Sequence, residues 1–132
     1  MELAPQDVLV IGKLSAALTA SIGFALRTDE VVLTPERAGH IRLRHPSDVY
    51  LLAQFGSAVV ASPDLVLLDD KNAATILLVK SIADMNCNMV LRLALLTDED
   101  TEKQNSIMTF HRIRDSYLKR LLSRKKILYK SE

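Results

Sequence analysis

The spacing of apolar and polar residues predicts two consecutive helices in the first half of the chain. A helix start signal begins at Thr34, with Pro35 at the first helical position and Glu36 in the first turn. Pro46 predicts the end of this helix, because the residue before a proline avoids helical backbone angles. A second helix is predicted over 47–60, where apolar residues recur on one stripe.

Shorter elements precede these helices. The sequence DVLVI predicts an extended segment over 7–11, and a second short extended piece is predicted over 31–33. Residues 15–26 are rich in small side chains, and their spacing favours a helix only slightly over a strand.

The second half changes to strand-like runs separated by polar turns. The four predicted strands lie at 65–68, 75–79, 89–96 and 106–113. The turns between them are predicted at 69–72, 84–88 and 97–104. A helix over 114–123 and an edge strand over 126–129 close the chain.

This order predicts an α+β domain with N-terminal helices packed on one face of a four- to five-stranded antiparallel sheet. We expect one domain over 1–132, in which residues 1–30 are an N-terminal extension and residues 31–130 form the core.

Alternation along the strands assigns their faces. Four apolar residues of the third predicted strand should face the helices: Met89, Leu91, Leu93 and Leu95. Arg92 then points to the other face, toward water or an anion. In the fourth strand, the set containing Met108 and Phe110 looks like the packed face and the set containing Thr109 and His111 like the open one, although a bulge would exchange them.

Composition narrows the class of protein. Of 132 residues, 48% are hydrophobic and 25% are charged, which is typical of a soluble, core-forming domain. The single cysteine, Cys87, excludes an intramolecular disulfide and a cysteine-based zinc cage, so we expect a cytoplasmic protein. The longest apolar run, 49–61, is too short to span a bilayer, and no membrane association is expected.

Charge is distributed unevenly along the chain. Residues 1–111 carry nine basic and fourteen acidic side chains, whereas residues 112–130 carry eight basic side chains against Asp115 alone. This basic tail, with Arg112, Lys125 and Lys126, is suited to contact phosphates. The alternative is that it forms the solvated end of a short helix, where the helix dipole favours cations.

Histidines provide the main candidates for chemistry. His40 and Arg44 lie four residues apart and share one helix face, where an imidazole can move a proton while a guanidinium holds a phosphate. The alternative is that His40 only packs between helix and sheet. The segment HIRLRH lacks the glutamate of a metalloprotease helix, so no metal site and no cofactor are expected.

Other polar residues are candidates for substrate contact. Ser106 and Thr109 place hydroxyls on the last long strand, and these either bind a phosphate oxygen or simply suit a strand. Lys80 and Arg92 are expected to line one surface. His45 follows the first helix directly and His111 lies on the fourth strand, and both are further candidates for substrate binding.

Taken together, these motifs resemble the phage-associated branch of the barnase–EndoU–colicin–RelE-like (BECR) nuclease superfamily. The similarity runs from Val31 to Lys130, and its most specific parts are the sequences HIRLRHP, NSIMT and ILYK. The resemblance implies a compact α+β fold and metal-independent RNA cleavage, often as a toxin domain. It transfers catalytic roles to three residues, which are His40, Arg44 and Thr109.

The sequence therefore predicts an endoribonuclease that acts by attack of the 2′-hydroxyl on the adjacent phosphate. RNA, with tRNA among the candidates, is the expected substrate, and a toxin of this kind has an immunity or antitoxin protein as partner. Phage encoding or delivery into a target cell is consistent with the resemblance. The alternative is a non-catalytic RNA- or protein-binding module of a phage or mobile-element assembly.

Overall fold

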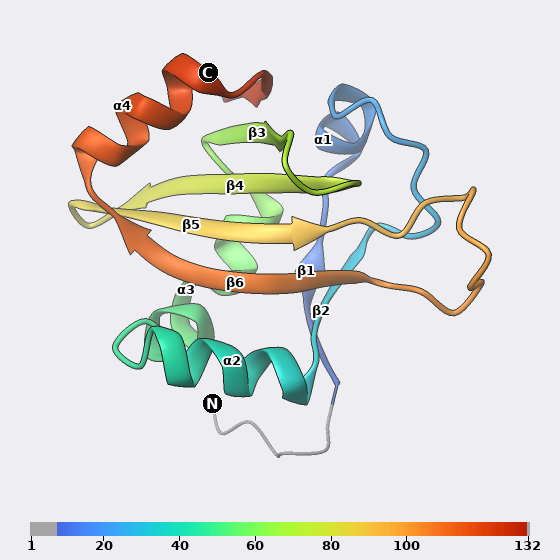
Figure 1. The fold of residues 1–132 in the computed structure, drawn as a ribbon, viewed down its shortest axis with the longest axis horizontal. Helices are drawn as coiled ribbons and strands as arrows, with labels where there is room; N and C mark the ends of the chain where they lie inside the picture. The colour runs from blue at the N-terminus through green and yellow to red at the C-terminus, as the bar shows by residue number, and fades with distance from the viewer. Residues whose placement is uncertain (1–7, 132) are drawn as a thin grey trace.

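The structure is a computed structural model that describes residues 8–131, and these form four helices and one seven-stranded sheet (Figure 1). The helices are α1 (Ala16–Ser21), α2 (Pro35–Arg44), α3 (Val49–Ala61) and α4 (Asp115–Arg124). The strands are β1 (Leu9–Lys13), β2 (Glu30–Leu33), β3 (Leu65–Asp69), β4 (Thr75–Ile82), β5 (Met85–Arg92), β6 (Asn105–Ile113) and β7 (Ile127–Lys130). The predicted α+β class is confirmed.

The sheet has more strands than predicted and is mixed. Its order is β1-β2-β6-β5-β4-β3-β7, and every neighbouring pair is antiparallel except β2 and β6. The prediction of a purely antiparallel sheet of four or five strands was therefore wrong. The parallel pair is possible because α2, α3 and three strands separate β2 from β6 along the chain, and a parallel pair needs such a crossover.

The predicted boundaries of α2 are confirmed by its caps. The Thr34 side chain accepts a hydrogen bond from the backbone N–H of Arg37 at 3.2 Å, and Pro35 begins the helix. The helix ends at Arg44, and the N–H of His45 donates to the carbonyl of Ile41 at 2.7 Å. Pro46 follows directly, so the α2–α3 connection is short and fixed.

One face of the sheet carries the main hydrophobic core, which α1, α2 and α3 help to build. Leu18 of α1, Ile41 of α2 and Leu52 of α3 are buried together with alternate residues of the central strands. Gly56 lets α3 approach β1, because a Cβ there would lie 2.9 Å from Cδ1 of Leu52 and 3.2 Å from Cγ2 of Ile11. Residues 8–30 thus contribute a strand and a helix to the domain.

The second face of the sheet carries a smaller apolar cluster beneath α4. Leu67, Leu77 and Ile113 of three strands pack there with Leu121 of α4. Leu77 alternates along β4 with Ile76 and Leu78 of the main core, so the two clusters lie on opposite faces. Figure 1 looks onto this second face, and α4 lies over one end of it.

The predicted orientation of the third strand is confirmed. Leu91 and Leu93 are fully buried in the cluster that includes Leu52, and Leu95 packs half-buried against it. Arg92 is exposed. The strand itself ends at Arg92, so Leu93 and Leu95 belong to the loop that follows.

A bulge in β6 changes the predicted faces of the fourth strand. Thr109 lies opposite Val90, but Ile107 lies opposite Leu91, so Met108 is an extra residue on β6. Ile107 and Phe110 consequently both face the main core, while Thr109 and His111 face the second side. Strict alternation predicts that Met108 shares the packed face with Phe110. The bulge makes this prediction wrong for Met108, whereas it is correct for Phe110.

The hairpin between β4 and β5 is tighter than the predicted turn over 84–88. Only Ala83 and Asp84 lie outside the paired strands, with φ values of +47° and +65°. Two consecutive residues in the left-handed region are typical of a two-residue hairpin loop. Residues 85–88 therefore belong to β5, which places Asn86 and Asn88 in the sheet.

Asn105 connects the start of β6 to two other segments. Its side-chain oxygen accepts from the N–H of Ala94 at 2.8 Å, and its amide nitrogen donates to the carbonyls of Thr28 and Glu30, both at 2.8 Å.

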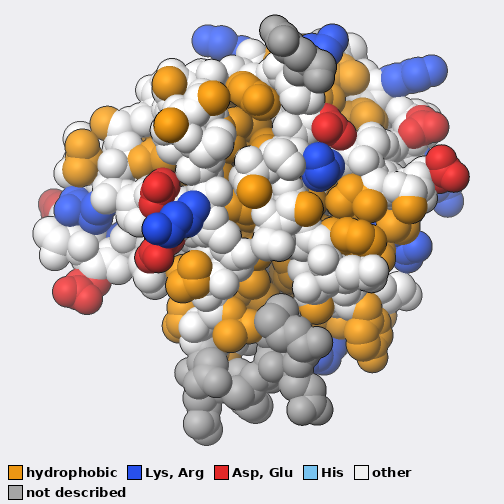
Figure 2. All heavy atoms as spheres, turned by 180° about the vertical axis from the view of Figure 1, so that it is seen from behind, with side chains coloured by type: hydrophobic (Ala, Val, Ile, Leu, Met, Phe, Trp, Pro, Cys, Tyr) orange, Lys and Arg blue, Asp and Glu red, His pale blue; other side chains and the backbone are white. Residues whose placement is uncertain are grey.

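Seen from behind, the opposite side of the molecule exposes apolar side chains at several places (Figure 2).

Candidate functional site

The short α2–α3 connection is held against β6 by Asp48. The Nε of Arg112 donates to Oδ1 of Asp48 at 2.6 Å, and the backbone N–H of Arg112 donates to Oδ2 at 3.3 Å. The Asp48 side chain is only 10% exposed, so this ion pair is well shielded on the carboxylate side. The pair fixes where the residues just before Asp48 meet the strand.

His45 and His111 come together at this junction. Their rings stack with centroids 4.6 Å apart and an interplanar angle of 18°. Burial lowers the pKa of His111 below its ordinary value of 6.5, the neighbouring His45 lowers it further, and the carboxylate of Asp48 opposes the shift. His111 is therefore mostly uncharged at neutral pH, the state in which an imidazole accepts a proton.

Three polar atoms on the second face near this junction are shielded from solvent without a hydrogen-bond partner among the residues that the structure describes. They are Nδ1 of His111, Oγ1 of Thr109 and Oδ1 of Asn88. Asn88 lies directly opposite His111 in the β5–β6 ladder, and Thr109 is two residues before His111, so all three share one patch. An unsatisfied buried polar group costs about 1–3 kcal/mol, so three in one patch make this patch a candidate for contact with a ligand.

A hollow of about 370 Å³ lies between this patch and α4. Its floor includes Asn88, Val90 and His111, and its α4 side carries Tyr117, Arg120 and Arg124. The Arg120 guanidinium lies 5.4 Å from the centre of the Tyr117 ring. The hollow thus joins an imidazole to guanidinium groups, which is a combination suited to a phosphate ester.

Lys125 closes the far side of this hollow through ion pairs. Its ammonium donates to Asp70 at 2.6 Å and lies 3.9 Å from Asp69, and its side chain is only 11% exposed. The ammonium lowers the pKa of Asp70, whose carboxylate raises the pKa of Lys125. Lys125, predicted as a phosphate contact, is thus engaged in holding the end of α4 to the β3–β4 turn, whereas Lys126 is exposed.

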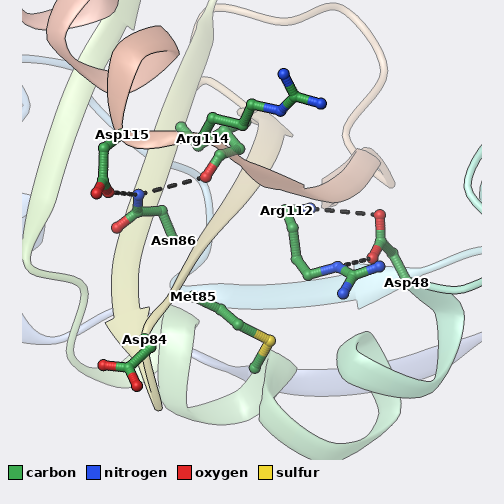
Figure 3. Close-up of a pocket in the computed structure, with 8 residues that line it drawn as sticks. Asp48, Asp84, Met85, Asn86, Arg112, Arg114 and Asp115 are labelled. Atoms are coloured by element: carbon green, nitrogen blue, oxygen red, sulfur yellow. Dashed lines mark hydrogen bonds and ion pairs between the residues drawn. The ribbon is translucent and has the colours of Figure 1, made fainter.

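A larger hollow of about 560 Å³ lies at the end of the sheet, beside the β4–β5 turn (Figure 3). Its polar groups are largely paired with one another. Asn86 donates to Asp115 at 2.7 Å and to the carbonyl of Ile113 at 3.3 Å, and Asp48 holds Arg112. These groups hold the start of α4 and the α2–α3 connection in place, and we assign them a positioning role.

The three residues expected to be catalytic are not gathered in the hollow beneath α4. His40 is half-buried on α2 and Arg44 is exposed in its last turn, and neither lines that hollow. Thr109 lies on the second face in the patch with His111. The structure brings together His45, His111 and Thr109 instead.

The remaining predicted contact residues divide between the two faces. Lys80 lies opposite Cys87 on the main-core side, where its ammonium donates to the carbonyl of Ser62 at 2.7 Å and lies 3.8 Å from Asp64. Arg92 points to the other face, so the expectation that both line one surface was wrong. Ser106 lies near Arg92 in a separate hollow at the start of β6.

Sequence reasoning missed several residues of this site. Asn88 was placed at the edge of a turn, because the tight hairpin was not anticipated. Arg120 and Arg124 belong to the predicted basic tail, and their four-residue spacing is a signal that they share a face of α4. Asp48, three residues after His45, gave no local signal for its partner, because Arg112 lies 64 positions later.

Other chemical roles find little support in the described residues. Within 8–131, no group of three or more His, Cys, Asp or Glu side chains is arranged to hold a metal ion. Burial raises the pKa of the Cys87 thiol, which leaves it a poor nucleophile. Across the same residues, no helix has the length and apolar character needed to cross a membrane.

Comparison of the chain with protein-family models, with curated proteins and with solved structures found no match.

Proposed function

We propose that this protein is an endoribonuclease that cleaves RNA by attack of the 2′-hydroxyl on the adjacent phosphate. The observation that carries the proposal is the stacked His45–His111 pair beside unpartnered polar atoms, next to a hollow lined by Arg120 and Arg124. The resemblance of 31–130 to the BECR nucleases supports the same reaction class.

In this proposal His111 accepts the proton of the 2′-hydroxyl, because its lowered pKa keeps it uncharged at neutral pH. The 2′-oxygen bonds to phosphorus, the bond from phosphorus to the 5′-oxygen breaks, and a 2′,3′-cyclic phosphate forms. The departing 5′-oxygen takes a proton from a water molecule, to which the protonated His111 returns one, and His45 holds the His111 ring in place through the stack. Arg120 and Arg124 stabilise the charge that develops on the phosphoryl oxygens.

The assignment of His111 differs from the one that the resemblance implies, which is His40. The geometry favours His111 because it faces the hollow with the guanidinium groups, whereas His40 is not part of its lining. Asp48 acts as a positioning residue, since it holds the connection that carries His45 against β6.

The test is cleavage of a mixed-sequence single-stranded RNA in the presence of EDTA, with analysis of the product ends. We expect 2′,3′-cyclic phosphate ends, and we expect His111→Ala to lower the rate by about 10²- to 10⁴-fold, the usual range for one acid–base group. His45→Ala, which removes the stacked ring but leaves the proton acceptor, should lower the rate by less, and His40→Ala should cleave at close to the parent rate.

Three outcomes would change the assignment. A loss of activity confined to His40→Ala would move the chemistry to α2 and keep the ribonuclease. RNA that is bound but left uncut would favour the non-catalytic binding module. RNA that is neither bound nor cut would remove both functions.

A further inference from the structure

The hollow beneath α4 continues along β5 and β6 toward the start of α2. A second hollow of about 190 Å³ shares Val90 with it, and a third of about 320 Å³ shares Arg92 and Met108 with the second. The three hollows follow one another across the second face through these shared residues, and we call this series of hollows the strand groove. The elements that line it are seen in Figure 1, where α4 lies at the upper left and the beginning of α2 at the lower right, with β5 and β6 between them.

Both ends of the strand groove carry cations. The α4 end has Arg120 and Arg124, which are exposed and are offset only by the Lys125-bound pair Asp69 and Asp70. The α2 end has Arg37, Arg92 and Lys103. There Glu36 is the one acidic lining residue, and Lys103 lies 3.6 Å from Asp98, so Arg37 and Arg92 are the cations best placed for a ligand.

The floor between these ends offers both apolar and polar contact. Val90 and Met108 are half-buried there, and Asn88, whose side-chain oxygen has no partner among the residues described, lines the α4 end. Asn88 is 97% buried from solvent, since its exposure is 3%. Such an acceptor is satisfied by the edge of an unpaired base or a sugar hydroxyl, whereas a base in a duplex already uses its pairing edge.

We propose that the strand groove binds an extended single-stranded RNA, with a distal phosphate held by Arg37 and Arg92 at the end away from His111. The span from Asn88 to Arg92 is four residues of β-strand, or about 13 Å. A ligand that touches both ends must therefore be longer than the group that reacts at His111. This inference rests on the proposed ribonuclease for the identity of the nucleic acid.

The test compares binding of uncleavable 2′-O-methyl oligouridines of two and eight nucleotides, measured by fluorescence anisotropy over a range of salt. The parent should bind the octamer at least about tenfold more tightly than the dimer, because only the octamer reaches the distal cations. Arg37→Ala/Arg92→Ala should weaken octamer binding by about tenfold and lower the slope of log affinity against log salt by about 0.7, the value for one phosphate of a single strand.

Three measurements separate a groove contact from a general loss of charge or fold. Binding and cleavage of a dinucleotide should be unchanged in the double variant, since the distal cations are out of its reach. Arg42→Ala, an exposed arginine of α2 outside the groove lining, should leave octamer binding at the parent value. Arg37→Lys/Arg92→Lys should restore most of the salt slope, because the charges return.

Equal affinity for dimer and octamer would overturn the proposal, as would tighter binding of a duplex octamer than of the single strand. Loss of dinucleotide binding in the double variant would also overturn it. Binding is read with oligomers that cannot be cut, so the groove is judged even if the parent cleaves nothing. In that case the ribonuclease fails while length-dependent binding still decides the groove.

Discussion

On the face of the sheet that carries the main hydrophobic core, Met89 and Phe110 are fully buried in a large apolar cluster. On the other face, α4 buries only a small cluster at one end, and His111 and Thr109 lie beside it with unpartnered polar atoms. Neighbouring residues of the same strands belong to these two environments. The comparison indicates that the first face supplies stability and that the second is free to serve binding and chemistry.

A matched pair of leucines on β4 tests this comparison with the largest expected effect on stability. Leu78 is fully buried in the main core, whereas Leu77 is 6% exposed beneath α4. Leu78→Ala should lower the free energy of unfolding by about 2–5 kcal/mol. Leu77→Ala should cost less, because α4 can settle and water can enter from the adjoining hollow. Urea unfolding of both variants measures the difference, and an equal cost would mean that the second face is sealed as tightly as the first.

The titration of His111 sharpens the comparison through pH. Its pKa in the folded protein lies below 6.5, the value in the unfolded chain. At a pH between the folded and the unfolded pKa, the unfolded chain therefore binds more protons than the folded one. The stability that His111 contributes is present above pH 6.5 and is lost as the pH falls through the folded pKa. In His111→Gln this loss disappears. The free energy of unfolding of the parent should therefore fall relative to that of the variant as the pH is lowered from 7 to 5. Urea unfolding across that range checks it, and a constant difference would show that His111 is not held uncharged by the fold.

The smallest effect is expected where α4 is held at its end. Lys125→Met should lower Tm by less than either leucine variant, because the lost contacts with Asp70 and Asp69 are ion pairs near the surface. Lys126→Met, at the exposed neighbouring position, is the matched control and should change Tm less. Thermal unfolding in 1 M NaCl should shrink the difference between the two variants, because the screening length is then only about 3 Å. A difference unaffected by salt would show that Lys125 acts by packing alone.

Local chemistry was enough to predict several parts of this molecule. Thr34 and Pro35 fixed the start of α2, because a capping hydroxyl and a proline act on their own helix turn. The alternation of Leu91 with Arg92 predicted which side of β5 faces the core, since burial separates adjacent residues of a strand. The bulge at Met108 broke the same rule on β6, because an extra residue interrupts the alternation, so the residues before and after it cannot be assigned with one phase.

The candidate site depends on contacts between residues that are far apart in the chain, and the local spacing of residue types does not predict such contacts. Lys80 contacts Ser62 and Asp64 on the face of the sheet opposite to Arg92. The register of the β4–β5 hairpin, which its two-residue turn sets, places the two cations on these different faces. The stack of His45 on His111 joins residues that are 66 positions apart in the numbering.

The α+β class, the ends of α2 and the core side of β5 can be predicted from the chain alone, because each depends on residues within a few positions of one another. The contact between two particular histidines depends on how distant elements pack. His45 reaches His111 because Asp48 binds Arg112 and fixes the α2–α3 connection on β6. The physical reason is that periodicity reports which face a residue occupies, whereas the pairing of distant elements depends on the packing of the whole chain.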